Sequence, residues 1–294
     1  ENSTVTYSVG GLILSNSGAV TANYWLSEIY DNEIAEAHRN ADIHIHDLSM
    51  LTGYCAGWSL KQLITEGLGA ITGKITSAPA AHLSVLCNQM VNFLGIMQNE
   101  WAGAQAFSSF DTYLAPFVKV DNLTYKEVKK CIEAFIYGVN TPSRWGTQAP
   151  FSNITLDWTV PADLAELPAI VGGQEMDFKY KDCKKEMDMI NKAFIETMIE
   201  GDANGRGFQY PIPTYSITRD FDWSDTENNR LLFEMTAKYG TPYFSNYINS
   251  DMEPSDVRSM CCRLRLDLCE RRKQTGGFFG SGESTGSVGV VTIN

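Results

Sequence analysis

The chain has 294 residues, of which 44% are hydrophobic and 20% are charged, which is the composition of a globular protein with a large core. Its formal net charge of -12 at pH 7 argues against nucleic acid and against an anionic membrane surface as main partners. It does not exclude nucleotides, because helix N-termini bind phosphates without a basic patch. The sequence has no run of about 18 apolar residues, so we predict no membrane-spanning helix.

The cysteines argue against a disulfide framework and against a zinc site, because they are odd in number, irregularly spaced and without a C-x-x-C pair. The seven are Cys55, Cys87, Cys131, Cys183, Cys261, Cys262 and Cys269. Unpaired cysteines are typical of a reducing cytoplasm, which is the expected location. Because the sequence opens without Met and stops in or just after a predicted strand, we expect a segment of a longer protein.

The first elements mix strands and helices. Residues 5–14 are predicted to be extended, and residues 19–39 to form one helix with apolar positions at roughly helical spacing. Residues 41–48 alternate as a short strand. Cys55 lies just beyond this strand, before a helix over residues 59–66.

A helical layer comes next. Helices are predicted over residues 80–101 and 107–117, and a third runs from Thr124 to about residue 137. Thr124 and Glu127 have the spacing of a capping box for this third helix. The apolar faces of the layer belong either to the core or to a subunit interface.

From residue 140 onwards strands alternate with helices. Strands are predicted at 148–158, 207–217, 243–248 and 287–293, and helices at 182–200 and 225–239. Strands separated by long helices indicate right-handed βαβ units, hence an α/β fold with a parallel sheet. Functional sites in such sheets gather at strand ends.

His44 and His46 lie on one face of the predicted strand, because side chains repeat every second residue. A His-x-His pair on a first strand begins the binuclear zinc site of some barrel hydrolases, but that site needs more histidines on later strands. This chain has four His residues and none after His82, which argues against a metal. We interpret the pair as a substrate contact, with a hydrogen-bonded structural pair as the alternative.

Two further stretches carry polar or reactive groups. Alternation places Gln148 and Ser152 on one strand face, where they either bind substrate or form a solvated edge. Cys261-Cys262 precedes a glycine-rich run over residues 276–286, which suggests a reactive thiol carried on a loop; two buried neighbours are the alternative. The run contains no Gly-Lys-Ser/Thr, so it is not a Walker A loop.

Four blocks in this order resemble the large subunit of the anaerobic, class III ribonucleotide reductases. They are DIHIHDL (42–48), LAPF (114–117), Cys262-Arg263 and GVVTIN (289–294). No single block is decisive, but the ordered set covers essentially the whole chain. Members of this family are glycyl-radical enzymes that reduce ribonucleoside triphosphates to deoxyribonucleoside triphosphates.

The resemblance implies a ten-stranded α/β barrel made of two five-stranded parallel halves, with a central finger loop. This chain resembles the first half-barrel with its helical layer, the finger loop and the first strand of the second half. Residues 1–140 would hold the N-terminal strand and the helical layer, a dimer and effector face. Residues 141–294 would hold half-barrel strands and the finger, and the two parts together would form one truncated catalytic domain.

The resemblance also implies residue roles. Cys262 would form a thiyl radical that abstracts the ribose 3′ hydrogen, with Cys261 as its neighbour. Cys55 would donate hydrogen at the 2′ carbon, and Asn294 would hold substrate hydroxyls. Asn at that position, where other members have Glu, implies formate as reductant.

Other family features concern binding. His44 and His46 would line the cleft, and the loop at 218–225, with Thr218, Arg219 and Asp220, would bind the effector. The expected partners are ribonucleoside triphosphates, ATP and dNTP effectors, a radical-SAM activating enzyme and a second copy of the chain. The glycyl radical and a structural zinc belong to a C-terminal part outside this sequence, and no metal is expected in this segment.

Two alternatives remain at this stage. One is a different glycyl-radical enzyme, such as a formate-lyase-like acyltransferase, although the His-x-His-Asp block and Asn294 argue against it. The other is a non-catalytic nucleotide-binding regulatory module, since this segment has no radical loop.

Overall fold

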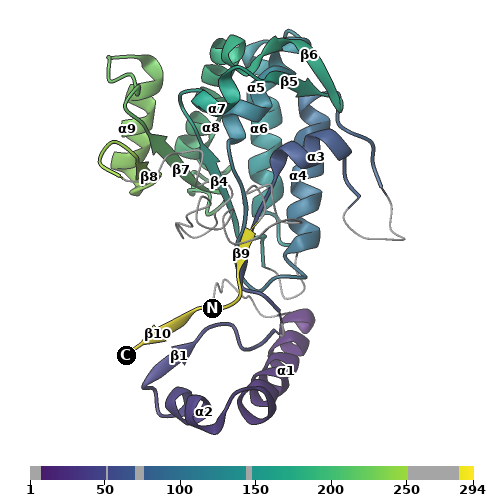
Figure 1. The fold of residues 1–294 in the computed structure, drawn as a ribbon, viewed down its shortest axis with the longest axis vertical. Coiled ribbons are helices and arrows are strands. Elements are labelled where there is room, and N and C mark those ends of the chain that lie inside the picture. Colours follow the sequence, from purple (N-terminus) through teal and green to yellow (C-terminus); the bar gives the residue numbers. More distant parts are fainter. Residues whose placement is uncertain (1–7, 51, 70–75, 144–147, 251–284) are drawn as a thin grey trace.

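The structure is a computed structural model that describes residues 8–50, 52–69, 76–143, 148–250 and 285–294. It has two lobes (Figure 1). The upper lobe holds a large sheet and most of the helices, and the lower lobe holds two helices and a two-stranded sheet. The last described strands run from the upper lobe into the lower one.

The upper lobe is built on a six-stranded sheet with the order β8-β7-β4-β3-β2-β9. The strands are β2 (Cys55–Trp58), β3 (Gln105–Phe107), β4 (Ser152–Leu156), β7 (Ile212–Ile217), β8 (Tyr243–Asn246) and β9 (Thr285–Ser287). The first five are parallel and lie side by side in chain order, as successive βαβ units require. The predicted α/β fold with a parallel sheet is therefore confirmed, and strands from before and after residue 140 share this sheet.

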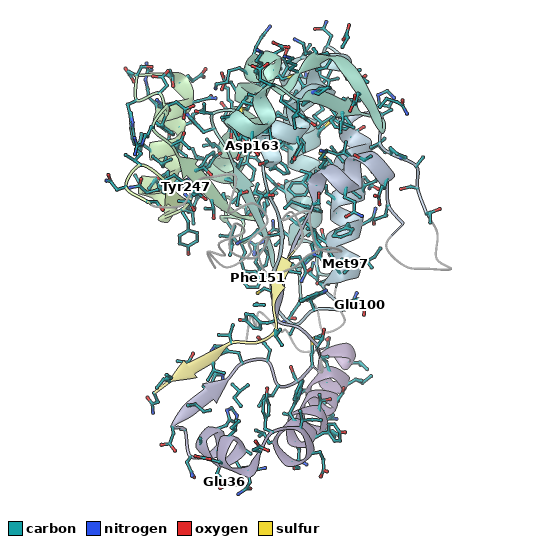
Figure 2. All side chains as sticks on the ribbon, viewed as in Figure 1. Glu36, Met97, Glu100, Phe151, Asp163 and Tyr247 are labelled. Carbon is teal, nitrogen blue, oxygen red and sulfur yellow. The ribbon has the colours of Figure 1, made fainter. Side chains whose placement is uncertain are left out.

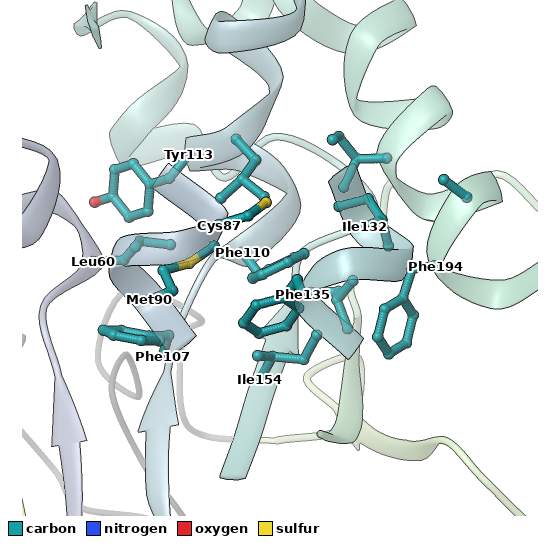
Figure 3. Packing of buried hydrophobic residues seen from close by; sticks show 14 of the residues in the cluster. Leu60, Cys87, Met90, Phe107, Phe110, Tyr113, Ile132, Phe135, Ile154 and Phe194 are labelled. Atoms are coloured by element: carbon teal, nitrogen blue, oxygen red, sulfur yellow. The ribbon is translucent and has the colours of Figure 1, made fainter. Parts of the chain in front are cut away.

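Helices pack on one face of the sheet, which we call the outer face. They are α3 (Leu60–Glu66), α4 (Leu83–Met97), α5 (Phe110–Val120), α6 (Tyr125–Asn140), α7 (Ala162–Ala165), α8 (Lys184–Glu200) and α9 (Glu227–Tyr239), with a 3-10 turn at Tyr180–Cys183. Figure 3 shows Phe107 and Ile154 of the sheet against Phe110 and Phe135 of the helices, and all four side chains are fully buried. The apolar face of α4 belongs to this same core.

The opposite, inner face of the sheet carries small and polar side chains. Strand register aligns Gly57, Ala106 and Asn153 in one row across β2, β3 and β4. The neighbouring row on β4 and β7 pairs Thr155 with Thr214. Because side chains alternate between faces, the large apolar residues of β2, β3 and β4 point to the helices, and the inner face of these three strands carries small and polar side chains. Ile212 of β7, opposite Asn153, continues the row on the inner face.

The lower lobe consists of α1 (Val9–Tyr24), a π-helical turn (Trp25–Ile29), α2 (Asn32–Arg39), β1 (Ile43–Ile45) and β10 (Val291–Ile293). β1 and β10 pair antiparallel. Because β9 pairs with β2 and β10 pairs with β1, the last ten residues tie the two lobes together. The indole of Trp25 donates a hydrogen bond to the carbonyl of Met50 at 3.1 Å, which fixes the helical part to the connecting chain.

Two N-terminal predictions are wrong. Residues 9–14 are helical, because the side chain of Ser8 accepts a hydrogen bond from the backbone N–H of Gly11 at 2.9 Å and caps α1. Residues 19–39 do not form a single helix, because the backbone is extended at Tyr30, with φ -84° and ψ 144°. Pattern alone did not show where the helical run breaks.

Short elements account for the other differences. The predicted strand at 287–293 is two strands in different sheets, and Phe107 ends β3 where a helix start was predicted. The sequence reading also missed a hairpin of β5 (Pro168–Val171) and β6 (Gln174–Lys179). Its turn is Gly172-Gly173, with φ of 62° and 72°, which is the left-handed backbone that such a hairpin turn needs.

Several local predictions are confirmed. α6 begins with the capping box of Thr124 and Glu127, and α9 ends at Tyr239, where the predicted helix 225–239 ends. Among the residues that the structure describes, no helix is both long and apolar enough to span a membrane.

Candidate active site

Cys55 is the first residue of β2, at the end of the large sheet that faces the lower lobe. Its side chain is buried, with 1% of the residue exposed. The backbone N–H of Ala104 donates a hydrogen bond to its Sγ at 3.2 Å. Its own N–H donates to the hydroxyl of Ser287 on β9 at 3.3 Å. Cys55 thus lies in a strand between β3 and β9 that was not predicted from the sequence.

The space around the Cys55 thiol is shaped by backbone. A Cβ atom added at Gly103 would lie 2.7 Å from the Cys55 Sγ and 2.8 Å from the carbonyl oxygen of Tyr54. Ala104 and Ala106 pack against Cys55 on the inner side, with Phe151 at the edge of this cluster. Figure 2 places Phe151 near the junction of the two lobes. Backbone and small apolar side chains therefore surround the thiol on this side.

His44 and His46 belong to a row of rings that leads to Cys55. The ring of His44 is 4.7 Å from that of His46, and His46 is 6.3 Å from the ring of Tyr54, the residue before Cys55. The predicted common face of the two histidines is therefore confirmed. His46 Nε2 shares a hydrogen bond of 2.8 Å with the hydroxyl of Thr292 on β10.

His38 extends this row at the other end, with its ring 5.5 Å from that of His44. Its Nδ1 accepts a hydrogen bond from the backbone N–H of Ile45 at 3.1 Å. Burial lowers the pKa of His38, and the neighbouring His44 and Arg39 lower it further. Within the described ranges, no three His, Cys, Asp or Glu side chains gather in a way that could hold a metal ion.

Asn294 lies away from this thiol. Its backbone N–H donates to the carbonyl of Asp42 at 3.1 Å, and its side-chain amide donates to that of Ala41 at 2.9 Å. In Figure 1 the C-terminus lies just after β10 in the lower lobe, whereas β9 lies in the sheet of the upper lobe. The structure does not bring this side chain to Cys55, and the role of Asn294 stays a prediction. Cys261 and Cys262 lie outside the described residues.

Ser152 and Gln148 are not joined to Cys55 either. Ser152 shares the outer face with Gln105 and Ile154, and it is fully buried under the helices. Gln148 precedes β4, and its backbone carbonyl accepts a hydrogen bond from Ser143 at 3.1 Å. Their substrate role also stays a prediction, to which this placement lends no support.

Asn153, which the sequence reading passed over, lies on the inner face with Cys55. The two faces of a strand exchange on a shift of one residue, so the choice between Ser152 and Asn153 depends on register alone. The alternation of Asn153 and Thr155 with Ile154 and Leu156 was visible in the sequence. It showed two faces but not which of them meets the helices.

The suspected effector loop follows β7. The hydroxyl of Thr218 donates to the carboxylate of Asp220, and the carbonyl of Thr218 accepts from the N–H of Phe221 at 3.1 Å. Arg219 is exposed. Phe221 stacks on Trp158, after β4, with the ring centroids 5.8 Å apart.

A cavity of about 390 Å³ adjoins this loop, at the carboxyl ends of β4 and β7. Its lining includes Trp158, Lys184, Lys192 and Asp222. The position suits a small-molecule site in a parallel sheet. The structure describes no contact of Thr218, Arg219 or Asp220 that tests an effector role.

The sheet has five parallel strands in chain order, helices on its outer face and small side chains on the inner face of its central strands. This arrangement is half of an α/β barrel. Residues 1–294 match the family described as "Anaerobic ribonucleoside-triphosphate reductase", and the chain belongs to that family. The recognition made from the ordered blocks is thus confirmed.

Solved structures share this fold. The Thermotoga maritima anaerobic ribonucleotide reductase in complex with dATP and CTP aligns with a TM-score of 0.65 at 22% identity, covering 84% of this chain and 44% of that chain. The same enzyme with glycerol in the active site aligns with a TM-score of 0.68 at 23% identity, covering 97% and 48%. The chain therefore spans less than half the length of these proteins. A comparison with curated protein sequences gives no match.

Proposed function

We propose that this chain takes part in the radical reduction of ribonucleoside triphosphates to deoxyribonucleoside triphosphates. The observation that carries the proposal is Cys55, a buried thiol on the inner face of a half-barrel whose sequence belongs to the reductase family. The binding of CTP and dATP by the Thermotoga maritima enzyme supports a nucleotide as substrate and as effector.

In the proposed mechanism, a thiyl radical at Cys262 takes the 3′ hydrogen atom of the ribose and becomes a thiol. The 2′ hydroxyl leaves as water with the proton of the 3′ hydroxyl, which leaves a 3′ ketone and a radical at the 2′ carbon, and Cys55 donates a hydrogen atom to that carbon and becomes a thiyl radical. Formate gives its hydrogen atom to the Cys55 sulfur, and the resulting carbon dioxide radical anion passes one electron to the 3′ ketone, which takes up a proton from solvent, and leaves as carbon dioxide. The 3′ hydrogen atom then returns from Cys262, which regenerates the radical.

The buried position of the Cys55 thiol suits such chemistry, because radical intermediates must be kept from water and oxygen. A thiol with 1% exposure, bounded by backbone and small apolar side chains, meets that condition. A glycyl radical would supply the oxidising equivalent to Cys262 when present. It and the structural zinc belong to family segments outside this sequence, so we assign no residue of this chain to either.

His44 and His46 are proposed to line the cleft, since their rings lead to Tyr54 beside Cys55. Asn294 is proposed to bind substrate hydroxyls, which requires β10 to take a different place in the complete barrel. Gln148 and Ser152 remain weaker candidates for substrate contacts.

The helical layer is proposed as the homodimer face. Val85 on α4 and Tyr137 on α6 are 44% and 45% exposed, and these two helices pack side by side. We propose that the loop with Thr218, Arg219 and Asp220 binds ATP or dNTP effectors. A radical-SAM enzyme as activating partner and the cytoplasm as location belong to the same proposal.

A nucleotide-binding module without turnover is the second candidate for the segment by itself. The observation that favours it is length, since the solved relatives are more than twice as long as the part this chain covers. The two candidate functions are compatible if residues 1–294 bind nucleotides without reducing them and a longer form of the protein carries out the reduction.

Substitution of the two cysteines tests the radical roles. In the intact enzyme, Cys262→Ala should abolish nucleotide reduction and leave effector binding unchanged, because only the hydrogen-abstracting sulfur is lost.

Cys55→Ser should also block product formation while substrate affinity stays within about two-fold, because a hydroxyl is a far poorer hydrogen-atom donor than a thiol. Turnover assays and binding titrations measure both, and measurable turnover of the alanine variant would contradict the assignment.

The reductant is tested separately with isotopically labelled formate. Carbon dioxide should form only when a ribonucleoside triphosphate is present, with one equivalent for each deoxynucleotide. Turnover that depends on thioredoxin and releases no carbon dioxide would reject formate and leave the cysteine roles in place.

A further inference from the structure

Asn153 is a polar side chain on the inner face, two strands away from Cys55. It lies opposite Ala106 of β3, which in turn lies opposite Gly57 of β2. Cys55 is two residues before Gly57 and so shares its face. Asn153 and Cys55 therefore face the same side of the sheet, on strands β4 and β2 with β3 between them.

The side chain of Asn153 is buried without a full set of hydrogen bonds. Asn153 is 7% exposed, and its Oδ1 has no hydrogen-bond partner in the described part of the chain. Two nearby polar groups are paired: Thr155 Oγ1 accepts from the N–H of Ser109 at 3.1 Å, and Gln105 Oε1 accepts from the indole of Trp58 at 2.6 Å. Ser152 Oγ, on the outer face of the same strand, is buried and, among the described residues, unpaired like Asn153 Oδ1. An unpaired buried amide oxygen is costly, so its retention calls for a function.

The row between Asn153 and the Cys55 side of the sheet is formed by small residues. Gly57 and Ala106, which fill the row next to Asn153, carry no side-chain atom beyond Cβ. Neighbouring strands lie about 4.8 Å apart, so β2 and β4 are separated by roughly 10 Å. That span suits a nucleoside lying across β3 with its reacting carbon at Cys55.

We propose that Asn153 is a substrate-binding residue whose Oδ1 accepts a hydrogen bond from the nucleotide. This inference rests on the proposed function. The partner must be a donor, either a ribose hydroxyl or a base amino group, because ionised phosphate oxygens only accept. The substrate thus completes a hydrogen bond that the protein leaves open.

The test compares three variants of the intact enzyme. Asn153→Ala and Asn153→Leu both remove the acceptor, and Leu keeps the volume of the side chain. Ile154→Val is the control, because it perturbs the same strand on the outer face. Calorimetry with CTP and with UTP measures affinity without any need for radical activation.

Both Asn153 variants should bind CTP about ten-fold more weakly than the wild type, and the control should stay within two-fold. An equal loss for CTP and UTP assigns the contact to a ribose hydroxyl, because cytosine and uracil carry their hydrogen-bond donors on different atoms, the C4 amino group and N3. A loss for CTP alone assigns the contact to the cytosine amino group. Asn153→Leu should unfold at the same temperature as the wild type or higher, because it replaces an unpaired polar group by an apolar one of similar shape.

Two results would overturn the inference. One is CTP and UTP affinities of both Asn153 variants within two-fold of the wild type. The other is a clear drop in the unfolding temperature of Asn153→Leu beyond that of Ile154→Val, which would make Asn153 a structural residue. If the wild type itself binds neither nucleotide, the proposed function fails, and that result is distinct from both.

Discussion

At the scale of single residues, the position of the Cys55 thiol is set by backbone geometry. Gly103 approaches it so closely that a Cβ there would overlap the sulfur, and the N–H of Ala104 binds the sulfur from β3. The sequence pattern placed Cys55 just after a strand, but it did not show why the residue at position 103 must be glycine. That reason is a contact between neighbouring strands, which local pattern does not contain.

Gly103→Ala should destabilise the protein and reduce turnover. The added methyl group would lie 2.7 Å from the sulfur and 2.8 Å from the Tyr54 carbonyl, so the thiol must move or the strands must separate. We expect a loss of about 1–3 kcal/mol in the free energy of unfolding, measured in urea. Gly69→Ala is the matched control, because its Cβ would meet only Thr76 at 3.8 Å. Equal stability of the two variants would refute the close contact.

At the scale of elements, one-residue register decides which side chains reach the cleft. β4 was predicted correctly as a strand, yet the face chosen for substrate contact was that of Ser152, which packs under the helices. The capping box of α6 was predicted fully, because Thr124 and Glu127 interact within a single turn. Hydrogen bonds within one helical turn can be predicted from sequence. Which side of a strand is buried depends on the helices that pack against the sheet.

The α2–β1 contact should weaken in acid. His38 Nδ1 accepts the N–H of Ile45, which requires a neutral ring, and the pKa of His38 is lowered from the ordinary value of 6.5. Because the folded pKa lies below the unfolded one, this stabilisation is complete above pH 6.5 and is lost as the pH falls through the folded pKa.

Hydrogen exchange at the Ile45 amide measures this. After correction for the intrinsic rate, exchange should be faster at pH 5 than at pH 7.5 in the wild type. His38→Gln should show no such difference, because it has no group that titrates in this range. A pH-independent wild type would contradict the role of His38.

At the scale of the whole molecule, one buried carboxylate connects two helices of the outer face to the sheet. Asp111 on α5 accepts the backbone N–H groups of Asp157 and Trp158 after β4, at 2.8 and 2.9 Å, and the side-chain amide of Asn191 on α8 at 2.9 Å. Asn191 in turn accepts from the hydroxyl of Tyr215 on β7 at 3.1 Å. Burial raises the pKa of Asp111, and these donors oppose the rise.

Asp111→Ala should lower the free energy of unfolding by about 3 kcal/mol or more, because it leaves several buried donors unpaired at once. Urea unfolding at pH 7 measures the loss. Asp177→Ala, at an exposed position of β6, is the control and should change stability by less than about 0.5 kcal/mol. A small effect for Asp111 would show that water replaces the carboxylate.

The sequence by itself determined the α/β class with a parallel sheet, the capping box of α6 and the family, through blocks whose order is specific. These features can be predicted from sequence because the spacing of apolar residues in a helix, a capping box and a family motif each depend on residues that are close together in the chain. The two strands β2 and β3, and the order of the strands in the sheet, came only from the structure. Tertiary structure alone decided that β9 and β10 enter different sheets, that Cys55 lies against Gly103, and that Asn153 faces inward where Ser152 was expected. Each of these depends on a pairing between distant segments, and that pairing is set by the core as a whole.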